Sequence, residues 1–113
     1  MMSLIRPLLV VALILGVSAS ATPPEKKRRL LIIGQSKGYQ HDSVSTAMVT
    51  LYNLGKTSGQ WETHFRTDCT AVTKKPLKWG AKNLDDFDAI VFFTDGNLDM
   101  DDSQKADLLS FMT

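Results

Sequence analysis

Residues 30–43 read LLIIGQSKGYQHDS, and this stretch decides the fold class. Its first four residues are apolar without alternation, which is typical of a strand buried on both faces of a parallel sheet. Beyond the loop, apolar residues recur at helical spacing, at Val44, Ala47, Met48, Leu51 and Leu54. A buried strand, a glycine-containing loop and a helix start form the first βα unit of a doubly wound α/β sheet. Ligands bind beyond the carboxyl ends of the strands in such sheets, so His41 and Asp42 stand where this fold class keeps its chemistry.

Two further strands complete the predicted sheet. Residues 89–93 (AIVFF) form a second apolar run without alternation, whereas residues 61–67 (WETHFRT) alternate. Alternation predicts one solvated face, as at a sheet edge, with His64 on that solvated face. Placing the alternating strand at the edge gives the strand order 2-1-3, the start of a flavodoxin-like sheet with three α/β/α layers.

This order brings two loops together at the switch point of the sheet. They are residues 34–42 after the first strand and residues 94–99 after the third. Adjacent parallel strands place their following loops side by side. We therefore expect His41 to face Asp95 and Asn97 across one cleft.

The helix boundaries follow from capping residues. Asp42 or Ser43 is expected to cap the first helix, which should end near Gly55 or Gly59. The last helix is expected after Asp99 or Asp101, with Gln104 in a capping-box contact to Asp101. Its predicted buried stripe is Ala106, Leu109 and Met112. Residues 74–83 show no clear period and are predicted to be a connection.

The first 21 residues have the order of a secretory signal peptide. A short region with Arg6 precedes an apolar stretch and the small-residue sequence Ala19-Ser20-Ala21. We expect cleavage after Ala21, a linker over residues 22–28, and a periplasmic or secreted protein. The single cysteine, Cys69, permits no internal disulfide in the mature chain.

The charge balance bears on the partners. Removal of Arg6 leaves 13 − 1 = 12 basic residues against 12 acidic ones, a formal charge of zero. Nucleic-acid binding requires a clustered basic surplus, so we expect no nucleic-acid partner. We also expect no stable membrane insertion after signal cleavage. The oligomeric state is left open.

Three features suggest calcium binding, phosphate binding or a cysteine nucleophile, but none of them matches the residues that these sites require. Residues 95–101 carry oxygen side chains at alternate positions, but Met100 and Ala106 occupy the positions where an EF-hand needs Gly and Glu. Residues 34–38 match neither phosphate-binding glycine pattern. Cys69 lacks a nucleophile elbow and is expected to be a small, semi-buried side chain away from the switch point. No metal is predicted, and the cofactor is left open.

The segment SKGYQHDSV at residues 36–44 resembles the Gly-aromatic-x-His-Asp-Ser signature of the ThuA-like (trehalose-utilisation) family. The similarity continues through residues 88–93 and 101–106 and spans roughly residues 29–113. The resemblance implies a fold like that of class I glutamine amidotransferases, without their catalytic cysteine. It also implies a later strand ending in Gly-x-His, so residues 29–113 are expected to be the amino-terminal part of a ThuA-like domain.

The resemblance further implies a role in carbohydrate catabolism, on a keto-sugar or glycoside. His41 and Asp42 would be the catalytic residues, and Tyr39, Asp95 and Asn97 would contact the substrate. The alternatives are a non-catalytic sugar-binding or interaction module and an inactive truncated fragment. Asp42 also has a purely structural interpretation, because aspartate stabilises a helix start.

Overall fold

The computed structural model describes residue 16, residue 18 and residues 20–113. The predicted signal peptide therefore lies almost wholly outside the described residues. The elements in chain order are β1 (Arg28–Ile33), α1 (Ser43–Ser58), β2 (Trp61–Arg66), η1 (Lys78–Gly80), η2 (Leu84–Asp86), β3 (Ala89–Phe92) and α2 (Asp102–Met112). Both η elements are single 3₁₀ turns within the connection from β2 to β3.

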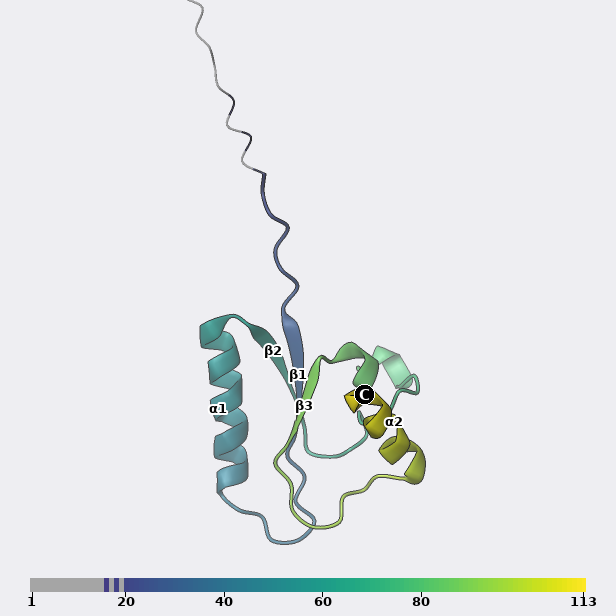
Figure 1. Ribbon diagram of the computed structural model, residues 1–113. Coiled ribbons are helices and arrows are strands. Elements are labelled where there is room, and N and C mark those ends of the chain that lie inside the picture. The colour runs from purple at the N-terminus through teal and green to yellow at the C-terminus, as the bar shows by residue number, and fades with distance from the viewer. Residues whose placement is uncertain (1–15, 17, 19) are drawn as a thin grey trace, which may run out of the picture.

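The sheet has the predicted strand order. All pairings among the described strands are parallel, and β1 lies between β2 and β3. Leu31 pairs with His64 on one side and with Ile90 on the other. Figure 1 shows α1 and α2 on opposite faces of this sheet, which gives an α/β architecture of three layers.

The face of the sheet that carries α2 holds the hydrophobic core. Leu31 and Ile33 of β1 point to this face and are fully buried. The long connection after β2 supplies most of their partners, since Val72 and Leu84 are also 0% exposed and Phe87 is 7% exposed. Val72 and Leu84, which flank the segment predicted as an irregular connection, thus belong to the core.

Helix α1 covers the opposite face, mainly over β2. Tyr52 packs against Phe65 with ring centroids 5.7 Å apart, and Gly55 lies directly against the indole of Trp61. Only glycine fits at this position without a shift, because the indole occupies the space that a Cβ would need. The helix ends at Gly59, whose φ of 69° is the left-handed conformation that glycine adopts without strain.

Two predictions about α1 need correction. Leu54 is 52% exposed and does not belong to the buried face, which ends at Gly55 instead. Asp42 occupies the N-cap position, but its backbone is helical and its side chain accepts no capping hydrogen bond. An N-cap carboxylate reaches the N–H groups of the first turn when its own backbone is extended. The backbone of Asp42 is not extended, so its carboxylate does not reach them.

The predicted stripe on α2 is also wrong. The start of the helix is as expected, with a capping box between Asp101 and Gln104. However, Leu109 and Met112 are more than 60% exposed, and it is Leu108 and Phe111 that pack against the core. The apolar residues of α2 occupy more than one face, so spacing alone could not select the buried one.

His64 on β2 is less solvated than predicted. Its side chain is 24% exposed, and its ring packs edge-on against Phe87 at 5.3 Å. Its Nε2 lies 3.1 Å from a carboxylate oxygen of Glu62, without hydrogen-bond geometry. The connection after β2 folds back over this face of the edge strand and covers the histidine.

Candidate functional site

The loops that follow β1 and β3 meet beyond the carboxyl end of the sheet. Gln35 O accepts a hydrogen bond from Asp95 N at 3.2 Å, and Lys37 N donates to Asp95 O at 2.8 Å. These two bonds form an isolated parallel bridge between Ser36 and Asp95. The bridge extends the β1–β3 pairing past the strand ends and fixes the backbone of Asp95.

Glycines allow the two loops to cross at close range. Gly96 has a φ of 78°, and a Cβ at this position would lie 2.9 Å from the backbone nitrogen of Gly38. A Cβ at Gly38 would in turn lie 2.8 Å from Asp95 Oδ2. Gly38, the first residue of the motif, therefore leaves the space that the Asp95 carboxylate occupies.

A pocket of about 320 Å³ opens beside this crossing, between the start of α1 and the end of β3. Its lining combines polar and apolar side chains, His41, Ser43, Thr94 and Asp95 with Val44, Ala47, Phe92 and Phe93. The structure thus places His41 and Asp95 on one pocket, although 54 residues separate them in the sequence. Ser43 and Thr94, which were not predicted as site residues, add two hydroxyl groups.

The motif residues differ in their relation to the pocket. His41 is exposed at its mouth, and Tyr39, itself 73% exposed, meets the His41 ring edge-on with centroids 4.9 Å apart. Asp42 does not line the pocket, and its carbonyl accepts hydrogen bonds from the hydroxyls of Ser45 and Thr46. Asn97 is exposed and does not line it either. The geometry therefore favours His41 and Asp95 over Asp42 and Asn97.

A second set of contacts joins the loop after β3 to side chains of the loop after β1. Gln35 is 7% exposed, and its side-chain amide donates to Asp99 Oδ2 at 3.2 Å while its oxygen accepts from Asp99 N at 3.4 Å. Lys37 Nζ approaches the same Asp99 oxygen at 2.8 Å. Sequence patterns did not identify Gln35, because a buried glutamine has no periodic or motif signal.

Cys69 belongs to this network, which corrects its predicted place away from the switch point. Its thiol donates to Gln35 Oε1 at 3.2 Å, directly below the loop after β1. Burial, and then the negative charges of Asp68 and Asp99, raise the pKa of the Cys69 thiol. A raised pKa keeps the thiol protonated at neutral pH, so Cys69 acts here as a buried hydrogen-bond donor and not as a nucleophile.

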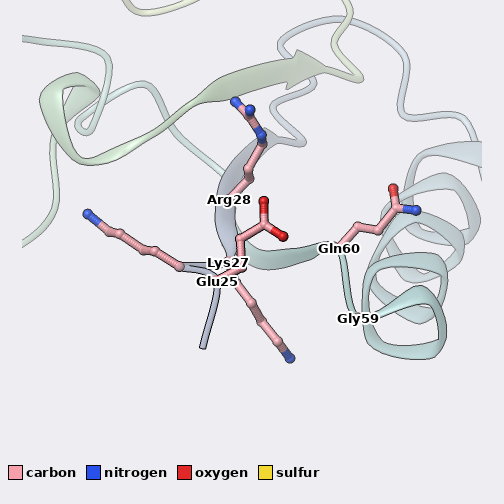
Figure 2. Close-up of a pocket in the computed structure, with 6 residues that line it drawn as sticks. Glu25, Lys27, Arg28, Gly59 and Gln60 are labelled. Carbon is pink, nitrogen blue, oxygen red and sulfur yellow. The ribbon is translucent and has the colours of Figure 1, made fainter. Parts of the chain in front are cut away.

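Another hollow lies at the opposite end of the sheet. Figure 2 shows its lining, which comes from the segment before β1 and the turn after α1, and its volume is about 330 Å³. The side chains of Arg28 and Gln60 point away from one another and not toward a common point. It also lies at the amino ends of the strands, where doubly wound sheets do not bind ligands. The pocket beside His41 is therefore the candidate site.

Neither a metal centre nor a membrane-spanning helix is found among the described residues. No group of three or more histidine, cysteine, aspartate or glutamate side chains among them is placed to hold a metal ion. In the same part of the chain, no helix has the length and apolarity to cross a membrane.

No protein-family model, no curated protein and no solved structure gives a significant match to the chain.

Proposed function

We propose that the pocket beside His41 binds a carbohydrate or a related polar metabolite, and that the protein is an exported member of the ThuA-like family with a flavodoxin-like sheet. The observation that carries the proposal is the pocket that joins His41 and Asp95 at the switch point of an α/β sheet. The combination of polar side chains and phenylalanine in the lining suits a ligand with hydroxyl edges and apolar ring faces.

His41 has the central role in this proposal. Imidazole changes its charge near neutral pH, so it can act as a general acid/base or exchange hydrogen bonds with a sugar hydroxyl. Asp95 offers a carboxylate acceptor on a main chain that two backbone hydrogen bonds hold in place. If the pocket turns its ligand over, the substrate class is a keto-sugar or glycoside. If it does not, the same residues form a sugar-binding module.

The two histidines of the chain provide a direct test. His41 lies at the pocket, whereas His64 lies on the face of the sheet that carries α2. In NMR spectra of the full chain, titration with a panel of neutral saccharides and keto-glycosides should shift the imidazole signals of His41 and leave those of His64 in place. His41→Ala should abolish the response at Ser43 and Thr94. A panel that moves neither histidine, or both equally, would contradict the proposal.

Export is part of the same proposal and has its own measurement. Cleavage after Ala21 predicts Thr22 at the amino terminus of secreted or periplasmic material, as determined by mass spectrometry. Recovery of the uncleaved chain in the membrane fraction would overturn this part without affecting the ligand test.

A further inference from the structure

The connection from β2 to β3 carries a cluster of positive charge that the proposed site does not use. Residues 69–84 contain four lysines, Lys74, Lys75, Lys78 and Lys82, and no acidic residue. Lys75 and Lys78 are exposed and Lys82 is half-buried, while Lys74 is turned inward and its Nζ donates to Ser110 Oγ at 2.7 Å. The segment that carries these lysines lies on the side of the sheet that carries α2 (Figure 1).

Trp79 lies in this segment and is unfavourable in two respects, the exposure of its side chain and the conformation of its backbone. Its side chain is 100% exposed, although tryptophan is highly buried on average in folded proteins. Its backbone has a φ of 55°, and it is the one non-glycine residue with positive φ in the described part of the chain. Gly80 follows with a φ of 67°. A bulky residue in the left-handed region costs on the order of 1–2 kcal/mol, and such strain clusters at functional sites.

The exposure of Trp79 does not come from a loose loop. Leu84 N donates to Thr73 O at 2.9 Å, which closes the base of the segment, and Asn83 Nδ2 donates to Lys75 O at 2.9 Å across it. Lys74 N donates to Asp107 Oδ2 at 2.8 Å and ties the segment to α2. These hydrogen bonds fix the backbone of the segment, and the indole is exposed although that backbone is held in place.

An apolar hollow bordered by cationic side chains lies against the same segment. It has a volume of about 370 Å³, and Ala71, Leu77 and Ala81 line it together with Arg66 and Lys78. The nearest acids in sequence are Asp85 and Asp86, and the Asp86 carboxylate is occupied by a hydrogen bond from Asn83 N. The surface therefore combines a projecting aromatic group, apolar patches and lysines that form no ion pair within residues 20–113.

We propose that residues 74–82 form a docking loop for the surface of an anionic phospholipid bilayer. Tryptophan prefers the interface between headgroups and acyl chains, and lysines near an anionic leaflet each contribute about 1 kcal/mol of attraction. Charge complementarity and the projecting indole select this partner. A single-stranded nucleic acid needs successive aromatic platforms, and the loop presents one. The contact is peripheral and involves no spanning segment.

The test follows the fluorescence of Trp79 in the full chain, in a Trp61→Phe background that removes the second tryptophan. Vesicles of phosphatidylcholine with phosphatidylglycerol should shift the emission to the blue, and brominated acyl chains should quench it. Vesicles of phosphatidylcholine alone should do neither. Because the signal comes from Trp79 itself, membrane binding by residues 1–21 does not mimic it.

Matched variants distinguish binding through the loop from binding through exposed charged or apolar residues elsewhere on the protein. Lys78→Gln should weaken binding about fivefold, which is the loss of one lysine's attraction, and Lys56→Gln on α1 should not. In a sedimentation assay, Trp79→Ala should weaken binding roughly tenfold or more, since affinity follows buried apolar area. Leu109→Ala on α2, which is also exposed, should leave it unchanged.

Three results would overturn the proposal. One is the absence of quenching by brominated lipid on anionic vesicles. A second is equal binding of the Lys78→Gln and Lys56→Gln variants. The third is a response of Trp79 to a soluble acidic polysaccharide or to single-stranded DNA that exceeds its response to anionic vesicles. The third result would assign the loop to a different polyanion.

Discussion

The two faces of the sheet are packed to different degrees. On the face that carries α2, fully buried side chains from β1 and the long connection form a continuous core. On the other face, α1 contributes only Gly55 to the buried residues and leaves hollows at both ends of β3. One of these is the pocket beside His41, and the other, of about 380 Å³, lies near Leu51 and Ala89. Stability is thus concentrated on one face, and the candidate site lies on the other, in keeping with the tendency of binding regions to be drawn from less stable parts.

The largest expected effect tests that difference in packing. Leu84→Ala removes a fully buried side chain from the core and should lower the free energy of unfolding by about 2–5 kcal/mol. Leu51→Ala, at a half-buried position on α1, should cost less than half as much. Urea denaturation of both variants measures the contrast. Equal losses would show that the two faces contribute alike.

A smaller effect is expected where α1 meets β2. Gly55→Ala adds a Cβ against the Trp61 indole, and this overpacking should outweigh the gain in helix propensity, for a net loss of about 1 kcal/mol. In a Trp61→Leu background the space is open, so the same substitution should become stabilising. A double-mutant cycle by thermal denaturation checks the change of sign. The same sign in both backgrounds would mean that the indole does not limit the approach of the helix.

The tie between the long connection and α2 predicts a dependence on pH. A hydrogen bond from Lys74 N, with a further one from Thr73, lowers the pKa of Asp107. A carboxylate with a lowered pKa in the folded state contributes stability above its unfolded pKa, and loses it as the pH falls through the folded value. Stability should therefore fall with acidification below the ordinary range of aspartate. The urea midpoint as a function of pH should flatten in Asp107→Asn, with a remainder from Asp68, whose pKa is lowered by a hydrogen bond from Thr70 N. An unchanged slope of the urea midpoint against pH would show that Asp107 does not contribute to the pH dependence of stability.

The smallest effect on stability is expected at the candidate site. Gly38→Ala adds a methyl group where the Asp95 carboxylate lies, and that side chain can move away into the pocket. Unfolding should change by no more than about 0.5 kcal/mol, as for other surface positions. The saccharide response of the His41 signals should nevertheless weaken, because Asp95 is displaced. A large loss of stability with an intact ligand response would mean that the crossing of the loops serves the fold and not the pocket.

Much of the sheet could be predicted because its signals are local. The apolar runs at residues 30–33 and 89–93 identified β1 and β3, and alternation identified β2 as an edge. The expected burial of both faces does not hold for β3, which is the other edge of the described sheet and has only half-buried or exposed residues. Strand order then placed His41 and Asp95 at the same end of the sheet. The start of α1 at Ser43 and the capping box of α2 also follow from residues next to each other in sequence.

Contacts between distant segments decided what local patterns could not. His64 is covered because the connection after β2 folds over it, and α2 buries Leu108 and Phe111 instead of Leu109 and Met112 because of where the core already lies. Gln35 and Cys69, which are 34 residues apart, meet only when the loops after β1 and β2 close over the same spot. Periodicity and capping act over a few residues and therefore determined the elements and their order. Burial depends on which segments pack together, so the remaining lining residues of the pocket and the exposure of Trp79 were decided by the tertiary structure alone.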